Sequence, residues 1–343
     1  MLTATDDPMD WSRLLDGLPL PAMLVQREDR TLAANPAALA LLGEGILGRN
    51  PAMAVRTPAV LEAIGTAARS GGLHEARMTL RRDGHEAVFQ VTVSRQGGDI
   101  VLCVFRDVTE EEKAGAMRRD FVANVSHELR TPLTALMGFI ETLKNAAKDD
   151  PKAREMFLGI METEAGRMNR LVRDLLQLSR VEAEERVRPR DPVEVRGLLE
   201  SVISSLRGVA EKAGDRVELV GDPVTVPGDA DQLVQVFTNL VENALKYGKG
   251  GQVVRVFLSA EETVRGPAVR VEVADEGEGI DPVHLPRLTE RFYRVDSHRS
   301  REMGGTGLGL AIVKHIVSRH RGWLRVESVV GEGSRFSVVL PLG

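Results

Sequence analysis

The sequence predicts a multidomain α+β protein, and three observations support that class. The chain has 343 residues, a length typical of roughly two or three domains. Its hydrophobic pattern changes along the chain, from short alternating runs to a repeat of three or four residues and then to a mixture of both. Residues 182–192 are charged and contain two prolines, which is typical of a linker. We therefore expect domains at 11–108, 109–187 and 193–343.

The composition is typical of a folded globular protein and does not indicate nucleic-acid binding. Hydrophobic residues make up 43% of the chain and charged residues 28%. Because 45 basic and 50 acidic residues leave a net charge of −5, there is no general basic field for nucleic acid. The single cysteine, Cys103, lies in a strand-like run. It excludes an intramolecular disulfide, and we expect it to be buried.

No stretch of the sequence approaches the roughly 18 apolar residues that a transmembrane helix needs. The first residues are acidic, whereas a signal peptide begins with basic residues followed by an apolar run. We therefore expect no transmembrane segment in this chain and a cytoplasmic location. Membrane association stays open for the case that an upstream segment is missing.

Residues 11–108 have the pattern of a small antiparallel sheet. A short helix is expected first, then two short strands, then a helix of small residues. Longer strands are expected at 75–84, 86–95 and 99–109, with turns at Glu28–Arg30, Asp83-Gly84 and Gly97-Gly98. We expect the helices to lie on one side of the sheet. No catalytic cluster stands out in this region.

Residues 109–187 are expected to form an antiparallel helical hairpin, because apolar side chains recur every three or four residues on both sides of a short polar break. The two apolar seams comprise Val122, Leu129, Leu133, Leu136, Ile140 and Leu143, and Leu158, Met161, Ala165, Met168, Val172 and Leu175. Two helices cannot bury both seams, whereas two hairpins in a four-helix bundle can, so we predict a homodimer. The alternative is that the hairpin packs on the other domains of its own chain.

Polar and ionisable groups interrupt the first of these helices. His127, Glu128 and Thr131 lie within about one helical turn, directly before Pro132. Proline lacks the N–H that would bond to the carbonyl of Glu128, so we expect a kink beside His127. On the heptad count His127 lies at the rim of the seam, where another domain can reach it.

Residues 193–343 mix both patterns and predict an α/β sandwich, in which helices cover one face of a mixed sheet. Helices are expected at 196–213, 230–247 and 307–320, and strands at 216–220, 253–260, 268–275, 323–328 and 334–341. The helix at 230–247 has Asn239 and Asn243 one turn apart on the same face, followed by Lys246. Amide oxygens suit Mg²⁺ that is held jointly with phosphate oxygens and water. A structural amide pair is the equally weighted alternative.

Two glycine-rich segments in the same region indicate a nucleotide site. In the segment 275–280, Asp275 can accept a hydrogen bond from an exocyclic amine, and Gly277 and Gly279 let the backbone approach a flat ring. In the segment 304–316, a glycine run opens a helix whose free N–H groups and positive dipole end form a phosphate site. This run is neither a Walker A loop nor a Rossmann fingerprint.

A long polar segment at 290–305 separates these two glycine runs, and we expect it to form a lid over the nucleotide. Arg294 is its best candidate for reaching a terminal phosphate. Most other histidines lie among charged or turn residues and are expected on the surface, namely His74, His85, His284, His298 and His320. His315 is expected to be packed or exposed rather than catalytic.

Six segments, in this order, resemble the H, N, G1, F, G2 and G3 boxes of sensor histidine kinases of two-component systems. They read SHELRTP, NLVENALKY, DEGEGI, RFYR, GGTGLGL and GEGSRF, and the resemblance covers residues 109–343. It implies a dimerisation and histidine-phosphotransfer hairpin, followed by an ATP-binding domain of the gyrase, chaperone and mismatch-repair ATPase (GHKL) type. The wording around the H box is most similar to the phosphate-regulon sensor kinases, which suggests a response to phosphate. Residues 30–38 and 105–109 resemble a PAS sensor domain.

The resemblance also implies roles for individual residues. Asn239 and Asn243 are implied to bind Mg²⁺ and ATP, and Asp275 is implied to anchor adenine. The other implied pocket residues are Lys246, Tyr247, Gly277, Gly279, Gly305, Thr306, Gly307, Leu308 and Gly309. Related ATPases that use water often carry a glutamate in place of Asn239. One departure from the pattern is Gly248, where a hydroxyl residue is common.

The implied reaction is ATP-dependent autophosphorylation of His127, followed by transfer to an aspartate of a response-regulator receiver domain. Glu128 is implied as the general base, and Arg294 as a group that neutralises phosphate charge. Thr131 resembles the residue that orients water for dephosphorylation of the regulator, so the protein is expected to be bifunctional. Two alternatives stay open: a GHKL-type ATPase that needs no His127, and an inactive scaffold that binds a regulator through its hairpin.

Overall fold

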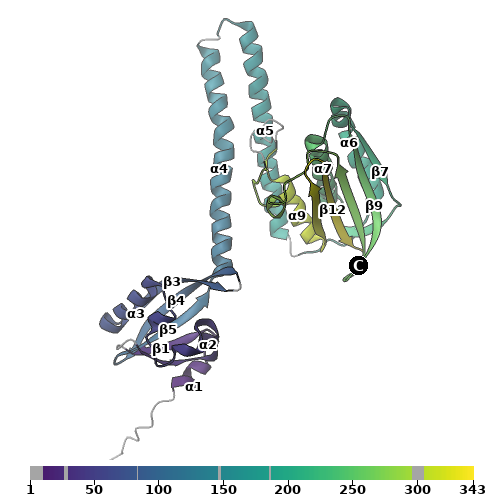
Figure 1. Ribbon diagram of the computed structural model, residues 1–343. Coiled ribbons are helices and arrows are strands. Elements are labelled where there is room, and N and C mark those ends of the chain that lie inside the picture. The colour runs from purple at the N-terminus through teal and green to yellow at the C-terminus, as the bar shows by residue number, and fades with distance from the viewer. Residues whose placement is uncertain (1–10, 27–29, 83, 146–147, 185–186, 296–304) are drawn as a thin grey trace, which may run out of the picture. The chain divides into compact units, whose positions relative to one another are not determined.

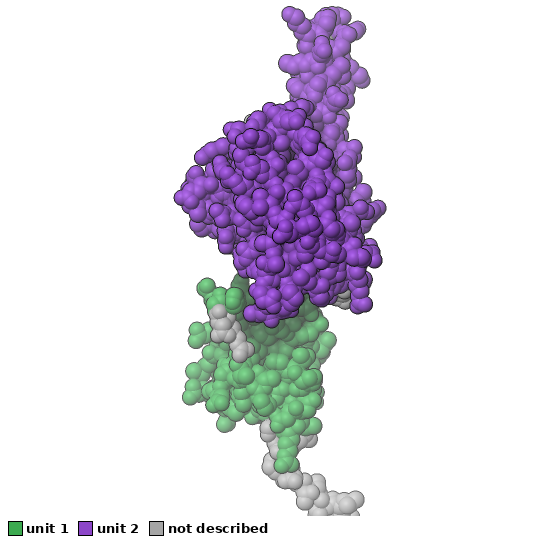
Figure 2. All heavy atoms as spheres, turned by 90° about the vertical axis from the view of Figure 1, so that its right-hand side faces the viewer, with its two compact units in different colours: residues 1–122 green, residues 123–343 purple. Residues whose placement is uncertain are grey.

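The computed structural model describes residues 11–343 except 27–29, 83, 146–147, 185–186 and 296–304. The chain divides into two compact units, residues 1–122 and 123–343, which Figure 2 colours separately. Several predictions lie wholly or partly outside the described residues, namely the turns at Glu28–Arg30 and Asp83-Gly84, His298 and most of the lid at 290–305. Within the described residues, every helix is too short or too polar to cross a lipid bilayer.

The first unit contains the predicted antiparallel sheet, with strand order β2-β1-β5-β4-β3 (Figure 1). Its strands are β1 Ala22–Gln26, β2 Arg30–Ala34, β3 Leu73–Arg82, β4 His85–Gly97 and β5 Ile100–Asp107. Its helices are α1 Trp11–Asp16, α2 Pro36–Leu42 and α3 Pro58–Ser70, with short 3-10 helices η1 Glu44–Ile46 and η2 Pro51–Met53. Sheet and helices together enclose a core that includes Cys103, whose burial raises its pKa to about 12.

The prediction that the helices share one side of this sheet is wrong. Met23 and Val25 of β1 belong to the core cluster that α3 closes. Ala22 and Leu24 point to the opposite face, where they pack with Leu15 of α1 in a second cluster. Successive side chains of a strand point to opposite faces, so β1, which lies between two strands and is apolar at its first four positions, is buried on both sides.

Asn35 ties the first strands and helices of this unit together. It is only 1% exposed. Its side-chain oxygen accepts hydrogen bonds from the backbone N–H groups of Ala22 (3.0 Å) and Ala38 (2.9 Å), and the second bond caps α2. Its side-chain nitrogen lies 2.8–3.3 Å from three carbonyl oxygens between residues 15 and 20. One amide therefore joins the segment after α1, the start of β1 and the start of α2.

Asn35→Ala should lower the free energy of unfolding by roughly 3 kcal/mol, because it leaves several buried backbone groups without partners. Asn50→Ala is the matched control, since Asn50 caps η2 with a single exposed bond to the N–H of Ala52 (2.8 Å). Urea unfolding of the full chain, followed by hydrogen exchange in β1, measures both losses. Equal losses in the two variants would contradict the role given to Asn35.

The predicted hairpin is formed by α4 (Thr109–Lys144) and α5 (Pro151–Glu184), which run antiparallel (Figure 1). Phe139 and Phe157 pack across it with ring centroids 5.4 Å apart. The helix α4 continues through Pro132, and the hydroxyl of Thr131 donates to the carbonyl of His127 (3.2 Å). The kink expected beside His127 stays a prediction.

None of the residues of the two predicted seams is fully buried in the single chain, and half of them are exposed. Leu133 of α4 is 49% exposed and Leu158 of α5 is 52% exposed. The buried apolar residues of α5 lie on another face, at Leu171, Leu178 and Val181, and this helix packs against α9. Thus α5 has two apolar faces, and its own chain covers only one of them.

The rest of the second unit is the predicted α/β sandwich. Its main sheet has the order β11-β12-β10-β9-β7, in which only the β7–β9 pair is parallel. The strands are β7 Arg216–Val220, β9 Val253–Thr263, β10 Gly266–Asp275, β11 Trp323–Val329 and β12 Gly333–Pro341. The helices α6 Val195–Ala213, α7 Ala230–Tyr247 and α9 Gly309–Arg319 cover one face of it (Figure 1), and η3 Leu285–Arg287 lies in a connection.

Two details of this region differ from the prediction. A short two-stranded sheet joins β6 (Asp191–Glu194) to β8 (Thr225–Gly228), although part of β6 was expected to be linker. The helix α9 begins at Gly309 rather than at residue 307, because Gly307 has a φ of 71°, which a helix cannot contain.

His320 is also not on the surface, as had been expected, but buried at 1% exposure. Its Nε2 accepts the backbone N–H of Asp229 (3.0 Å), and its Nδ1 donates to the carbonyl of Ile316 (2.8 Å). Asp229 is the N-cap of α7. Burial lowers the pKa of His320, because the charged ring loses its hydration. The ring is therefore neutral in the fold and ties the end of α9 to the start of α7.

The stability of the protein should fall as the pH drops below about 6.5. The unfolded chain protonates His320 near its usual pKa of about 6.5, whereas the folded chain takes up this proton only at lower pH. Urea unfolding between pH 7.5 and 5.5 measures the slope, which His320→Gln should reduce. His85→Gln, at an exposed histidine, should leave the slope unchanged. Identical slopes in all three proteins would contradict this prediction.

Candidate active site

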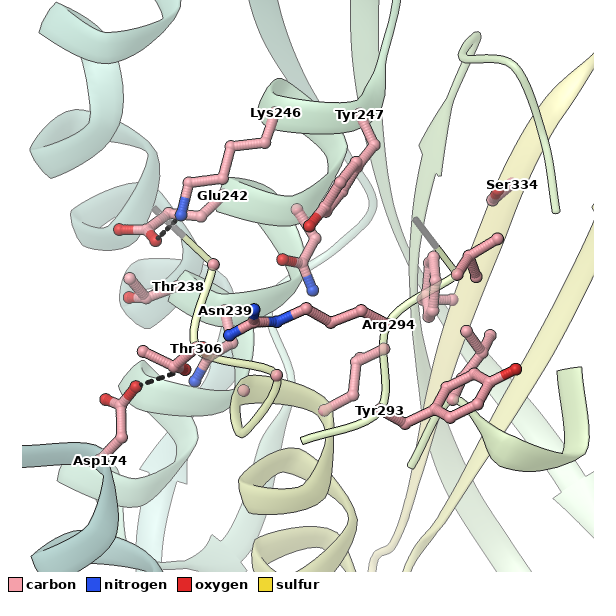
Figure 3. Close-up of a pocket in the computed structure, with 18 of the residues that line it drawn as sticks. Asp174, Thr238, Asn239, Glu242, Lys246, Tyr247, Tyr293, Arg294, Thr306 and Ser334 are labelled. Atoms are coloured by element: carbon pink, nitrogen blue, oxygen red, sulfur yellow. Dashed lines mark hydrogen bonds and ion pairs between the residues drawn. The ribbon is translucent and has the colours of Figure 1, made fainter. Parts of the chain in front are cut away.

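A cavity of about 540 Å³ lies in the second unit, a size typical of small-molecule sites. Its walls come from α7, the loop after β10, residues 288–295, the start of α9 and one face of α5. Figure 3 shows Lys246, Tyr247 and Asn239 reaching into this space from α7, with Arg294 extending across it toward Asn239.

One end of the cavity is built around Asp275, the last residue of β10. Its Oδ1 accepts the backbone N–H groups of Gly277 (2.8 Å) and Ser334 (3.3 Å). Burial raises the pKa of Asp275, and these two N–H groups oppose that rise. Because both bonds fall on Oδ1, Oδ2 is placed to accept a hydrogen from a ligand amine.

The two glycines after Asp275 are needed for close packing. A Cβ at Gly277 would lie 2.5 Å from the carbonyl oxygen of Tyr247, at the end of α7. Gly279 has a φ of 70°, and a Cβ there would lie 2.0 Å from the carbonyl oxygen of Val329. Gly279 lines the cavity, whereas Gly277 supports the loop from behind.

The other end of the cavity lies at the start of α9, where the predicted phosphate loop runs. A Cβ at Gly309 would lie 2.7 Å from Oδ1 of Asn239, so the first turn of α9 packs directly on this amide. The N–H of Leu308 donates to the hydroxyl of Thr306 (3.3 Å). The side chain of Leu308 is fully buried in the core, so this residue can face a ligand only through its backbone.

The polar residues of α7 are held in defined positions. Asn239 donates from its side-chain nitrogen to the carbonyl of Gln235 (3.0 Å), which turns its oxygen toward the start of α9. Lys246 pairs with Glu242 (3.1 Å), a residue that also lines the cavity. Asn243 lies between Asn239 and Lys246 in the sequence of α7 and lines the same cavity.

The hairpin helix α5 also lines this cavity, and this role of α5 was not predicted from the sequence. Asp174 accepts the hydroxyl hydrogen of Thr306 (2.8 Å; Figure 3). Burial raises the pKa of Asp174, and the bond from Thr306 opposes that rise. Arg170 and Arg173 also line this side. A signal for this face was present, since Asp174 falls at helical spacing between the apolar residues Leu171 and Leu178.

The predicted phosphorylation site lies on α4 and is linked to the cavity through Arg294. His127 is exposed. The guanidinium of Arg294, whose side chain is only 7% exposed, contacts Oε2 of Glu128 at 3.1 Å. Arg167 of α5 contacts the same oxygen, also at 3.1 Å. A residue of the cavity wall thus touches the carboxylate next to His127.

The structure brings most of the predicted site residues together. Those that line the cavity are Asn239, Asn243, Lys246, Tyr247, Asp275, Gly279, Arg294, Gly305, Thr306, Gly307 and Gly309. Gly277 and Leu308 lie directly behind this wall. His127, Glu128 and Thr131 lie on α4, outside the lining. Arg167 and Asp174 are the contacts that sequence reasoning missed.

Comparison with known proteins gives the family. Residues 117–184 match the His Kinase A (phospho-acceptor) domain, and residues 228–343 match the Histidine kinase-, DNA gyrase B-, and HSP90-like ATPase family. The phosphate regulon sensor protein PhoR of Pseudomonas aeruginosa is 43% identical over 249 residues, which are 72% of this chain and 55% of PhoR. The chain belongs to the sensor histidine kinases.

This histidine kinase is also 37% identical to the sensor histidine kinase WalK of Bacillus subtilis over 272 residues, which are 77% of this chain and 44% of WalK. The chain spans about half the length of these curated relatives. A solved structure of the histidine kinase ThkA in complex with the response regulator protein TrrA matches with a TM-score of 0.52. That match covers 97% of this chain and 98% of the other at 21% identity, so it bears on the fold alone.

Asp275→Ala should weaken ATP binding by roughly 10- to 100-fold, the effect expected when a hydrogen bond to a charged group is lost. Glu276→Gln is the control, because the neighbouring carboxylate is half exposed and pairs with Arg255. Equilibrium titration with a fluorescent ATP analogue measures both affinities. An unchanged affinity in a folded Asp275→Ala protein would contradict the expected role of Asp275 in binding adenine.

Proposed function

We propose that this protein phosphorylates itself on His127 from ATP and passes the phosphoryl group to an aspartate of a response-regulator receiver domain. The observation that carries the proposal is the contact between Arg294 and Glu128. It joins a cavity with the features of a nucleotide site to the residue directly after His127. The family membership supports the same reaction.

In the proposed first step, a ring nitrogen of His127 forms a bond to the γ-phosphorus of ATP. The bond from that phosphorus to the β,γ-bridging oxygen breaks, and ADP leaves with its electron pair. The other ring nitrogen loses its proton to Glu128, which acts as general base. The neutral imidazole ring of a histidine is a good nucleophile, which suits His127 to this attack. In the second step, an aspartate oxygen of the receiver domain forms a bond to the same phosphorus, and the bond from phosphorus to the ring nitrogen breaks with its electron pair left on nitrogen. The imidazole regains the proton that Glu128 had taken.

We propose Mg²⁺ as the cofactor that accompanies ATP, held by Asn239 and Asn243. The oxygen of Asn239 faces the start of α9, where the glycine loop would hold phosphates, so the donor type and its direction fit a hard cation. When bound, Mg²⁺ neutralises charge on the phosphates. Lys246 and Arg294 supply further positive charge, and Asp275 orients adenine.

We propose that the active form is a homodimer with a four-helix bundle. The exposed seams of α4 and α5 support this, because apolar side chains such as Leu133 and Leu158 are about half exposed in the single chain. A second hairpin that packed on these seams would bury them.

We further propose that residues 11–108 form a PAS-type sensor domain and that Thr131 takes part in dephosphorylating the regulator. The five-stranded antiparallel sheet with flanking helices supports the first point. For the second, the hydroxyl of Thr131 lies one helical turn after His127 and is exposed, so a water molecule can reach it.

His127→Ala should abolish labelling of the protein by ATP that carries ³²P in the γ-position, because the attacking nitrogen is gone. ATP affinity should stay unchanged, since His127 does not line the cavity. His315→Ala, at a histidine on α9, is the control and should still be labelled. Labelling that persisted in His127→Ala would contradict the proposal. Steady ATP hydrolysis by that variant would favour a GHKL-type ATPase.

A further inference from the structure

The carboxylate of Glu128 is held by two arginines at a single oxygen. Nη2 of Arg294 and Nη2 of Arg167 both lie 3.1 Å from Oε2. The side chain of Arg167 is 14% exposed and that of Glu128 is 22% exposed. Hydrogen bonds between charged groups are stronger when they are sheltered from solvent in this way. Oε1 of Glu128 is not used by either arginine.

The two arginines differ in what else they can bind. Arg294 lines the nucleotide cavity, and its buried Nε has no hydrogen-bond partner among the described residues. A guanidinium binds phosphate oxygens in a planar fork, so the phosphates of a nucleotide would compete with Glu128 for Arg294. Arg167 lies on α5 and does not line the cavity, so a nucleotide does not compete for it.

We propose that Arg167 is a positioning residue for the phosphorylation of His127. It holds Oε2 of Glu128 and so keeps Oε1 available as the proton acceptor beside His127, while Arg294 turns to the phosphates. This inference rests on the proposed function, in which Glu128 is the general base. In the structure, both arginines contact the carboxylate of Glu128. When ATP is bound and Arg294 contacts its phosphates, Arg167 holds this carboxylate alone.

The charges around Glu128 explain why one cation has to remain. The ionisable groups placed near it are Arg167 and Glu164 of α5, Arg294, and His127 of its own helix. Glu164 lies 3.9 Å from Nη1 of Arg167, and its Oε2 is buried without a hydrogen-bond partner among the described residues. Without Arg167, the departure of Arg294 would leave Glu128 with a second carboxylate nearby and, among the residues that the structure describes, no cation paired with it.

The test is the initial rate of autophosphorylation as a function of ATP concentration, and its value at saturating ATP is taken as kcat. Arg167→Ala should lower kcat about tenfold or more, as part of the effect of a general base is lost. It should leave the KM for ATP within about twofold, because Arg167 is outside the cavity. Arg167→Lys, which keeps the charge, should recover most of the lost rate. Arg180→Ala, at an exposed arginine of the same helix, should behave as the unaltered protein.

A double-mutant cycle separates this role from a purely structural one. In a Glu128→Gln background, Arg167→Ala should cause no further loss of kcat, because its effect passes through the carboxylate. Arg167→Gln is measured in parallel, with unfolding midpoints, in case the alanine variant does not fold. The inference is overturned by an unchanged kcat, by an equal loss in both backgrounds, or by a lysine variant no faster than the alanine variant. If the unaltered protein takes no label at all, the proposed function itself fails, and this is seen before any variant is compared.

Discussion

The packing of α5 against α9 is the contact on which the arrangement of the second unit depends. Leu171, Leu178 and Val181 bury one face of α5, and this places polar residues of the same face against the nucleotide cavity. Charged pairs extend the contact toward the end of the helix, where Glu182 meets Arg291 and Glu184 meets Arg319. Because these pairs are partly exposed, the apolar contact supplies most of the stabilisation and the charges set the register.

Much of the fold could be predicted because it follows from local pattern. The bounds predicted for α7 agree with the structure, since Asp229 caps its start and Gly248 ends it. The small strands β6 and β8 were not predicted, because their prolines and charged residues give no strand-like pattern. They are stabilised by their pairing with each other, which local sequence does not show. The two-sided burial of the first sheet was also missed, although β1 is apolar at successive positions.

The candidate site could be predicted where its residues are neighbours in sequence and not where distant segments meet. The glycine loops and the amides of α7 can be recognised in the sequence by residue type and spacing. The helical spacing of Asp174 marks its face of α5 but not the segment that this face meets, because Asp174 and Arg167 contact residues 132 and 39 positions away in the sequence. The burial of His320 was not predicted for a related reason, because a single buried polar residue produces no periodic pattern in the sequence.

The buried Cys103 has a practical consequence for experiments on this kinase. It is the only cysteine in the chain, it is fully buried, and with a pKa of about 12 almost none of it is thiolate near neutral pH. The native protein is therefore nearly inert toward thiol-directed dyes and spin labels. A cysteine introduced at Val264, an exposed residue in the turn between β9 and β10, would be modified selectively. A second cysteine on α5 would then give a pair of probes whose separation can be compared with and without ATP.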